Sequence, residues 1–528
     1  MPNSLLCVPE NAVLTGWDFS TGAVKCLAFD LNGNVLAESR FPTELSLGED
    51  GAIELNLLQL EGQARQTLRA MTAKLREMGR FDDWIAGGIS ATHHTAGRID
   101  ALGGQIRRAI CWNDQTLAEF HALGMERLGG AEKVQELIGG PWAIRYSLSH
   151  LVKDEIRLER SKWLATHRIQ THGGLAAGYL TGNFDVLSVS AAASTGMMDF
   201  RTRQWRREML NALQDEELRR MAWSQLPEII DADTPIGNAA GLFAYEEAQL
   251  PPNLRGFGLA RAQGPLIFPT SDDQQAGLVG GGAVNDGEIA VILGNSAVVN
   301  SSCAVIPSSD VNLDVMALNW GPYLLMRCYG NGAYFMDRVL GADPDFAALE
   351  KAAEACGPGA NGARILPFLI SEPSLGIHSP HLEWIGEEPA EQGVRFRACL
   401  EALAYLIALG VEEHRKAGCA VRSISVSGGV AKSDLMCRIL ASVLNFPLRR
   451  LESQEGPALG AAVTALSAVE NHLRQEKGIE TEEKFTVHDA VRQMVRFRED
   501  VQPVGEWVEA YRQGLEQFRE SVRAVSAN

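Results

Sequence analysis

Two similar segments, one near the start of the chain and one near its middle, constrain its fold most strongly. Residues 16–38 read GWDFSTGAVKCLAFDLNGNVLAE, and residues 287–307 read GEIAVILGNSAVVNSSCAVIP. In each, an apolar run leads into a short turn of small polar residues and then into a second strand-like run, which is typical of a β-hairpin. We therefore expect two hairpins, and a fold built from two related halves.

The turns at the two hairpin tips are small and polar. They are formed by Ser20, Thr21 and Gly22 in the first hairpin, and by the sequence Gly-Asn-Ser over residues 294–296 in the second. Such turns leave backbone N–H groups unobstructed and add side-chain donors, which together suit the oxygens of a polyphosphate. The pair of tips therefore predicts a site in which both hairpins bind one nucleotide.

Length and composition limit the remaining possibilities. A chain of 528 residues exceeds what one hydrophobic core serves and implies at least two domains. No run of about 18 apolar residues is present to span a bilayer, and the nine cysteines form no CxxC pair, so we expect a cytoplasmic protein without a membrane partner. A formal charge of −18 disfavours a nucleic-acid partner.

Strand-like and helix-like segments alternate along the chain, which predicts α/β layers. Residues 60–78 are typical of a helix and residues 84–92 of a buried strand. The stretch 231–265 holds several Pro and Gly residues, and we place the boundary there, between domains of residues 1–262 and 263–528. Further helices are expected over residues 395–418, 433–446 and 503–525, the last amphipathic and packed onto the body.

Several common ligand motifs are absent or lie in the wrong context. No GxxxxGK[ST] phosphate loop occurs, and GPGANG (residues 357–362) follows a helix-like segment instead of a strand, unlike a dinucleotide-binding turn. His93 and His94 are adjacent, so on an extended segment they would point to opposite sides, and no carboxylate nearby in the sequence completes a metal site.

Several segments together resemble the FGGY family of carbohydrate kinases, in the actin and hexokinase superfamily. Asp18, Ser20, Thr21, Gly22 and Lys25 resemble the family's Asp-x-Gly-Thr-x-x-x-Lys phosphate segment. Residues 271–282 look like the segment of its catalytic aspartate, and residues 425–448 and 455–466 like its adenosine-binding segments. Residues 90–100, 109–116 and 179–205 are most similar to xylulokinase-like members. The resemblance implies two actin-like (ribonuclease H-like) α/β domains around a cleft.

The resemblance implies roles on the nucleotide side, with ATP and Mg²⁺ as cofactors. Asp273 would be the base that accepts the proton of the sugar hydroxyl and, with Asp18, a magnesium ligand; a turn or cap is the alternative role for Asp273, and a turn for Asp18. Asp272 precedes Asp273, and because neighbours on a strand face opposite sides, we expect only Asp273 to reach the cleft. Lys25 would contact phosphate or be an ordinary solvated lysine. The remaining predicted ATP-binding residues are Ser20, Thr21, Gly22, Gly294, Asn295, Ser296, Gly428, Gly429 and Ser433.

On the sugar side the resemblance implies contacts from His93, His94, Trp112 and Asp114, together with Asp273. His94 stands at the histidine of the family's Ser-Gly-Gln-Met-His-Gly segment, and His93 stands in place of its methionine. Trp112 and Asp114 match the family's Trp-Asn-Asp, where an aromatic face and a carboxylate can hold a sugar, although core packing is an alternative for Trp112.

Two further positions depart from xylulokinase-like sequences. Thr116 stands where an arginine is common, and Ala191 where an acidic or amide residue is usual. We expect an ATP-dependent kinase for a ketopentose such as xylulose, and the resemblance leaves a homodimer and a monomer both open. Another pentulose, a polyol or a hydroxy-ketone are alternative substrates, and a catalytically inactive nucleotide-binding regulator on the same fold is an alternative role.

Overall fold

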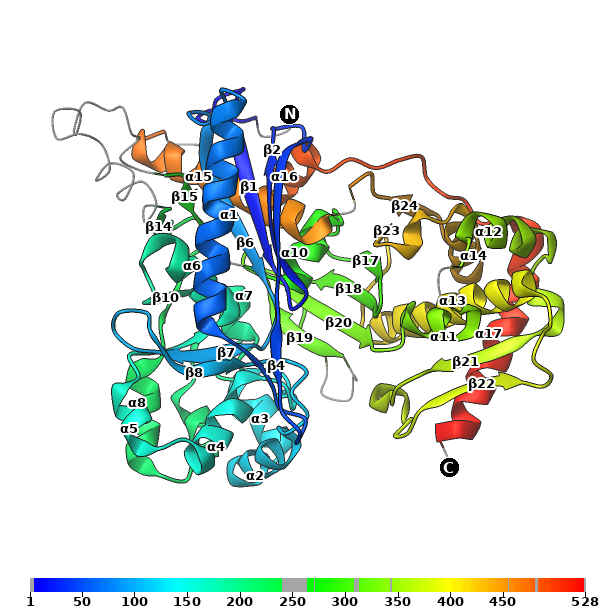
Figure 1. Ribbon diagram of the computed structural model, residues 1–528, viewed down its shortest axis with the longest axis horizontal. Coiled ribbons are helices and arrows are strands. Elements are labelled where there is room, and N and C mark those ends of the chain that lie inside the picture. The colour runs from blue at the N-terminus through cyan, green and yellow to red at the C-terminus, as the bar shows by residue number, and fades with distance from the viewer. Residues whose placement is uncertain are drawn as a thin grey trace.

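The computed structural model describes residues 4–239, 264–269, 271–307, 313–341, 344–453, 455–479 and 483–526. The chain forms two lobes side by side, each built on a mixed sheet with helices packed against it (Figure 1). This arrangement agrees with the predicted pair of α/β domains.

The sheet of the first lobe has seven strands in the order β14-β15-β6-β1-β2-β3, with β16 also pairing with β6. Its strands are β1 (Val13–Phe19), β2 (Ala23–Phe29), β3 (Val35–Pro42), β6 (Trp84–Ala91), β14 (Gly237–Asn238), β15 (Leu266–Ile267) and β16 (Ser271–Asp272). Antiparallel pairing of β1 with β2 confirms the first predicted hairpin, and β6 confirms the predicted buried strand.

Helices cover both faces of this sheet. On one face α1 (Leu57–Glu77) and α6 (His172–Thr181) pack over Trp17 and Ile89, and α1 confirms the helix expected there. On the other face α15 (Gly456–Glu476) packs over Leu14 and Ala86. Because side chains of a strand alternate between faces, β1 contributes to both cores.

A smaller unit of helices around a five-stranded sheet extends the first lobe, at the lower left of Figure 1. The strand order is β4-β5-β8-β7-β9. Its elements are β4 (Leu45–Leu47), β5 (Ile53–Leu55), β7 (Ala96–Ile99), β8 (Gln105–Ile110), β9 (Arg168–Thr171), α2 (Ala118–Leu128), α3 (Ala131–Ile138), α4 (Ser147–Arg157), α5 (Arg160–Ala165) and α8 (Glu216–Gln225). Nearby are α7 (Val189–Ala193), the turn η1 (Arg207–Ala212), and the strand pairs β10 (Val186–Ser188) with β13 (Glu228–Ile230) and β11 (Met198–Asp199) with β12 (Gln204–Trp205).

The second lobe has a six-stranded sheet in the order β19-β20-β18-β17-β23-β24. Its strands are β17 (Glu288–Leu293), β18 (Ala297–Cys303), β19 (Asp314–Ala317), β20 (Tyr323–Tyr329), β23 (Ser423–Ser427) and β24 (Leu448–Arg450); β21 (Arg364–Phe368) and β22 (His381–Ile385) pair separately. The helices are α10 (Asp273–Gly280), α11 (Tyr334–Leu340), α12 (Phe346–Ala355), α13 (Gln392–Lys416), α14 (Asp434–Leu444) and α17 (Gly505–Ser526), with the short 3-10 helices η3 (Ala360–Gly362), η4 (Pro373–Leu375) and η5 (Val430–Lys432). Helix α16 (Val487–Met494) comes late in the chain but packs beside α15 on the first lobe (Figure 1).

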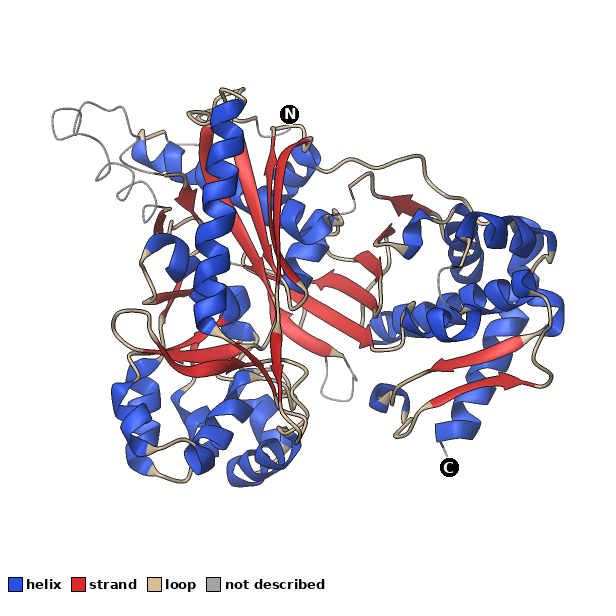
Figure 2. Ribbon diagram, in the orientation of Figure 1, coloured by secondary structure: helices blue, strands red, loops and turns tan. Residues whose placement is uncertain are grey.

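The second lobe confirms the remaining secondary-structure predictions. β17 and β18 pair as the second hairpin, and α13 and α14 match the two expected helices. Helices gather on one side of the lobe's sheet (Figure 2), where Ile289 and Leu403 share one core. The last helix, α17, buries Tyr511 and Phe518 against this body, as its amphipathic pattern predicts.

The expected boundary between residues 262 and 263 lies outside the described residues and stays a prediction. Strands β15 and β16, which follow it in the chain, join the sheet of the first lobe. Helix α15 also packs on that sheet, although it comes between elements of the second lobe. The N-terminal tail is fastened to the same helix, because the N–H groups of Leu6 (2.8 Å) and Val8 (2.9 Å) donate to the Glu470 carboxylate.

Helix α15 approaches its neighbours at backbone distance. A Cβ atom added to Gly16 of β1 would lie 1.7 Å from the Ala458 carbonyl oxygen, and one added to Gly460 would lie 1.8 Å from the Ala276 carbonyl oxygen of α10. Only residues without side-chain bulk permit such approaches. The glycine- and alanine-rich sequence of α15 therefore allows this helix to pack closely against both β1 and α10.

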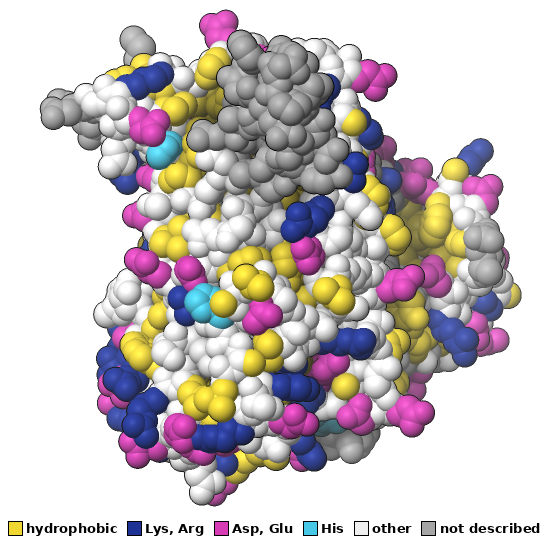
Figure 3. Space-filling model, turned by 60° about the vertical axis from the view of Figure 1, so that its left-hand side comes forward, with side chains coloured by type: hydrophobic (Ala, Val, Ile, Leu, Met, Phe, Trp, Pro, Cys, Tyr) yellow, Lys and Arg dark blue, Asp and Glu magenta, His cyan; other side chains and the backbone are white. Residues whose placement is uncertain are grey.

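Charged side chains of both signs intermingle on the face drawn in Figure 3. Among the residues that the structure describes, no helix is both long and apolar enough to cross a membrane. The expectation of no nucleic-acid partner stays a prediction.

Replacement of Gly16 by alanine tests the join between β1 and α15. The added methyl group has to displace the backbone of α15, so we expect Gly16→Ala to lower the free energy of unfolding by roughly 3 kcal/mol. Gly62→Ala in α1 is the control, because no atom lies within 4 Å of its added Cβ and alanine favours a helix. The free energies of unfolding would be measured in urea. Equal values for Gly16→Ala, Gly62→Ala and the parent would contradict the close packing of α15 on β1.

Candidate active site

Asp272 and Asp273 lie at the junction between a strand and a helix. Strand β16 ends at Asp272 and α10 begins at Asp273, so the expectation that the two aspartates face opposite sides of one strand is wrong. Asp272 caps the helix by accepting a hydrogen bond from the Gln275 N–H (2.7 Å), and its side chain is 4% exposed. Asp273 is 26% exposed. The predicted base is therefore the more accessible carboxylate of the two.

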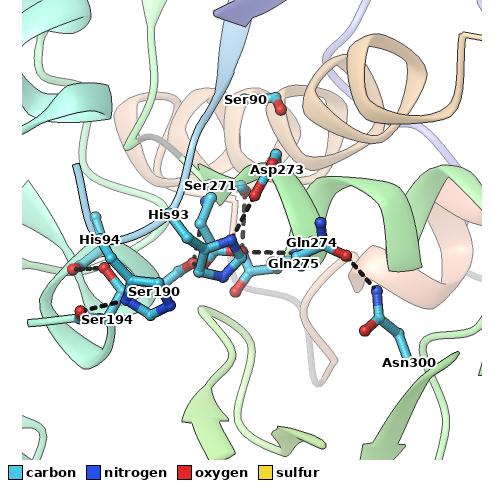
Figure 4. Close-up of polar contacts among 12 residues, drawn as sticks. Ser90, His93, His94, Ser190, Ser194, Ser271, Asp273, Gln274, Gln275 and Asn300 are labelled. Carbon is cyan, nitrogen blue, oxygen red and sulfur yellow. Dashed lines mark hydrogen bonds and ion pairs between the residues drawn. The ribbon is translucent and has the colours of Figure 1, made fainter. Parts of the chain in front are cut away.

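His93 lies between these two carboxylates, and Figure 4 shows its ring beside Asp273. Its Nδ1 contacts Asp273 Oδ1, and its Nε2 lies 2.8 Å from Asp272 Oδ1. Burial opposes protonation of the ring, but the two carboxylates outweigh it and raise the pKa of His93 to about 10. The ring is therefore an imidazolium at neutral pH. Both carboxylates lie about 180 positions away in the sequence, so no neighbouring residue indicates them.

His94 does not point away from His93, because the segment is not extended. A positive φ of 57° at His94 turns the chain, and the two ring centroids lie 5.0 Å apart. His94 Nδ1–H donates to the Ser194 carbonyl oxygen (2.7 Å), and the ring stacks on Tyr146 with centroids 4.3 Å apart. Burial lowers the pKa of His94 well below its usual range, so its buried Nε2 is an acceptor, without a hydrogen-bond partner among the described residues.

One cluster of potential metal ligands lies in this region, formed by His93, Asp272 and Asp273. Their potential ligand atoms all lie within 4.8 Å of one another. However, the two carboxylates contact different nitrogens of one ring, and a single ion binds an imidazole through one nitrogen only. This cluster is an ion-paired bridge between two carboxylates.

Asp18 is a second buried carboxylate in this region. It lies near the end of β1, and Ser90 Oγ donates to its Oδ1 (3.2 Å). Burial raises the pKa of Asp18 to about 7; Lys25 opposes the shift and Asp273 adds to it. Two carboxylates that repel each other and offer hard oxygen ligands match the donor set that Mg²⁺ prefers. Asp18 and Asp273 therefore fit the predicted magnesium role.

Lys25 is not an isolated surface lysine. Lys25 lies opposite Asp18 in the antiparallel register of β1 and β2. Its Nζ lies 2.7 Å from Glu455 Oε2. Glu455 is the residue that precedes α15. The ammonium group is thus placed between the first hairpin and the start of that helix, while its contact with phosphate stays a prediction.

The tip of the first hairpin is tight and open to solvent. Ser20 Oγ donates to the Ala23 carbonyl oxygen (2.8 Å), which closes the turn. Thr21 is partly exposed and Gly22 fully exposed, with no atom within 4 Å of a Cβ added to Gly22. The backbone at this tip is accessible, as the predicted phosphate contact requires.

The tip of the second hairpin is held by a neighbouring loop. Gly294 N–H donates to the Ser296 carbonyl oxygen (3.0 Å), and the Asn295 carbonyl oxygen accepts from Gly332 N–H (2.9 Å). Asn295 is exposed. The phosphate roles of Gly294, Asn295 and Ser296 stay predictions.

The predicted adenosine segment has the expected strand-turn-helix form. Strand β23 ends before Gly428, and Ser433 caps α14 by accepting from Met436 N–H (3.0 Å). Gly428 has a φ of +95°, and an added Cβ would lie 2.3 Å from the Leu293 carbonyl oxygen. Gly429 has no atom within 4 Å of an added Cβ, so its surface is open. Contact with a nucleotide stays a prediction for all three predicted residues.

Two predicted sugar ligands differ in their surroundings. Trp112 is 39% exposed, which disfavours the alternative of core packing. Asp114 is buried, and it accepts hydrogen bonds from the Ile53 N–H (2.9 Å) and the Thr116 N–H (2.9 Å). Lys153 Nζ lies 3.8 Å from Asp114, next to Thr116. Sugar contacts of Trp112 and Asp114 stay predictions.

Sequence reasoning missed the residues that support Asp273. They are Asp272 and Ser190, whose Oγ donates to Asp272 Oδ2 (2.5 Å). An aspartate followed three residues later by glutamine is a helix-start signal, which identifies Asp272 as a cap from sequence alone. No such signal exists for Ser190, because it lies 82 positions away from Asp272.

The fold and the paired hairpins define a two-lobed α/β protein of the actin-like class. The model of the N-terminal domain of the FGGY family of carbohydrate kinases matches residues 13–246, and that of the C-terminal domain matches residues 384–469. The chain belongs to the FGGY family of carbohydrate kinases, and it is a sugar kinase of the xylulokinase-like kind.

Individual relatives are distant in sequence. A xylulose kinase of Haemophilus influenzae is 24% identical over 393 residues, which are 72% of this chain and 75% of the relative. Among solved structures, a gluconate kinase of Lactobacillus acidophilus has a TM-score of 0.78 at 17% identity, and a xylulose kinase of the same organism has 0.77 at 18%. Each alignment covers 98% of this chain and 99% of the other. At such identities the structures establish the fold alone.

Replacement of Gly428 by alanine tests the backbone geometry of the predicted adenosine segment. Its positive φ and the nearby Leu293 carbonyl oxygen both oppose a side chain, so we expect Gly428→Ala to lower the free energy of unfolding by roughly 2 kcal/mol. Gly429→Ala is the matched control and should remain within about 0.5 kcal/mol of the parent. Equal unfolding midpoints for the two variants would argue against the strain described here.

Proposed function

We propose that this protein transfers the γ-phosphoryl group of ATP to a hydroxyl of a ketopentose, with xylulose as the first candidate. The observation that carries the proposal is the accessible Asp273 carboxylate at the start of α10, fixed by a histidine and close enough to Asp18 to influence its charge. The xylulose kinase among the sequence relatives supports the choice of sugar.

Asp273 would act as the general base. As the sugar hydroxyl attacks phosphorus, its oxygen loses a proton, and a carboxylate within hydrogen-bond reach accepts it. His94 Nε2, buried and without a partner among the described residues, would accept a hydrogen bond from another hydroxyl of the sugar. The partly exposed Trp112 ring would cover the carbon chain. These contacts would align the attacking oxygen, which accounts for much of the rate in such reactions.

Members of this family use ATP, generally with magnesium. In this chain Asp18 and Asp273 would hold the ion, which neutralises phosphate charge when it is bound. The backbone N–H groups of both hairpin tips and the Lys25 ammonium group would bind phosphate oxygens. The open backbone at Gly429 and the start of α14 at Ser433 would receive the nucleoside.

A sugar panel tests the reaction and its base together. ADP release would be measured with Mg–ATP and xylulose, ribulose, gluconate, glycerol, erythritol or a set of aldoses. We expect xylulose to give the highest kcat/KM, and Asp273→Asn, which preserves shape but removes the base, to lower kcat by roughly 10²–10⁴-fold.

Two outcomes of this experiment would overturn the proposal. If no compound raises ADP release above the rate without sugar, the phosphotransfer function fails. If Asp273→Asn turns over xylulose as fast as the parent, the reaction stands but the base is another group. A clear preference for gluconate or a polyol would replace the ketopentose with that compound.

The magnesium assignment predicts a separate effect at Asp18. Asp18→Asn keeps the shape of the side chain and its contact with Ser90 but removes a hard anionic ligand. We expect the variant to need at least about tenfold more Mg²⁺ for half-maximal ADP release, a loss of roughly 1.4 kcal/mol in ion binding. Thermal unfolding in the absence of ion controls for folding, and an unchanged Mg²⁺ requirement would exclude Asp18 as a ligand.

A further inference from the structure

The contacts around Asp272 give it a supporting role. Asp272 Oδ2 accepts from Ser190 Oγ (2.5 Å), its Oδ1 accepts from the Gln275 N–H (2.7 Å), and the same Oδ1 lies 2.8 Å from His93 Nε2. Both oxygens are therefore occupied within the protein. With 4% of its side chain exposed, Asp272 is a fixed anchor that does not reach substrate.

The residues that bind Asp272 are hydrogen-bonded to one another through Asn319. Ser190 N–H donates to Asn319 Oδ1 (2.9 Å), and Asn319 N–H donates to Gln275 Oε1 (3.1 Å). Ser190 belongs to α7 and Asn319 follows β19, so the two lie 129 positions apart in the chain. A closed set of hydrogen bonds through Asp272, Ser190, Asn319 and Gln275 holds the anchor in one place.

His93 transmits this fixed position to Asp273. The register of β16 on β6 places Asp272 beside Ala91, two residues before His93. The ring is 6% exposed, and its other nitrogen contacts Asp273. Among the residues that the structure describes, Asp273 accepts no other hydrogen bond, so this contact alone selects its side-chain orientation.

We propose that His93 is a positioning residue that holds the Asp273 carboxylate for catalysis, and that it is not a sugar ligand as its place in the sequence implied. The inference rests on the proposed function, because it assigns Asp273 as the base. Both ring nitrogens lie against carboxylates in a side chain that is 6% exposed. Nε2 makes its 2.8 Å ion pair with Asp272 without an aligned hydrogen bond, but it is buried, so neither nitrogen is open to a sugar hydroxyl. In the family segment a methionine stands at the position of His93. A methionine cannot bridge two carboxylates, since a thioether has no hydrogen-bond donor.

The double substitution His93→Met with Asp273→Asn separates positioning from direct contact. We expect His93→Met alone to lower kcat for the best sugar by roughly 10²-fold, with KM for the sugar changed less than about threefold. Added to Asp273→Asn, it should cause no further loss of kcat, because a residue that acts through the base has no effect once the base is gone.

His93→Gln serves as a second variant in case His93→Met does not fold. Its amide is uncharged and has a single donor nitrogen in place of the two ring nitrogens, so its kcat should fall between those of the parent and His93→Met. His167→Gln is the matched control: His167 Nε2 also pairs with an aspartate, Asp185 (3.0 Å), but at the surface. That variant should keep the parent kcat and KM.

The outcomes distinguish the inference from the function on which it rests. A loss with Asp273→Asn together with a parent-like kcat in both His93 variants refutes the positioning role and leaves the base assignment standing. A raised KM for sugar at unchanged kcat makes His93 a direct sugar ligand and also refutes it. Losses that multiply in the double variant refute action through Asp273. An active Asp273→Asn variant contradicts the proposed base itself.

Discussion

The contact of α15 with β1 and α10 is the constraint on which the rest of the structure depends. This helix lies against the first sheet at Gly16 and against α10 at its own Gly460, in both places at a distance that admits no side chain. Because α10 begins with Asp273 and β1 ends beside Asp18, the same packing fixes the two carboxylates relative to each other. A methyl group inserted at either contact would therefore alter the site as well as the stability of the fold.

The site concentrates negative charge where water is scarce, and its positive groups are arranged to compensate for this. His93 offsets part of the charge of the two adjacent aspartates, whereas Asp18 has Lys25 as its partner across the hairpin, and Glu455 also engages Lys25. Burial raises the pKa of Asp18, and Lys25 offsets that rise only in part. A carboxylate whose charge the protein neutralises incompletely, such as Asp18, favours the binding of a cation. Asp272 already has its partners within the protein and does not favour one.

Local patterns predicted the hairpins, the buried strand β6 and the helices α1, α13, α14 and α17, because each has a clear apolar period. The fold class and the kinase family were also predicted correctly. The sequence misplaced Asp273 on a strand because β16 is only two residues long, too short to show alternation. It missed the partners of His93 because they lie about 180 positions away and are set by the register of β16 on β6. The positive φ of His94 has no local signature, since non-glycine residues in general seldom adopt it.

The fastening of the N-terminal tail to Glu470 has a consequence for synthesis of the chain. Residues 6–8 bind Glu470 of α15, roughly 460 positions later, and the face of β1 that carries Leu14 also packs against α15. On a ribosome the chain emerges from its N-terminus, so this apolar face of the first sheet stays uncovered until α15 has left the tunnel. Such a face is open to association with other chains, and the first lobe would therefore need shielding by a chaperone during translation more than the second lobe would.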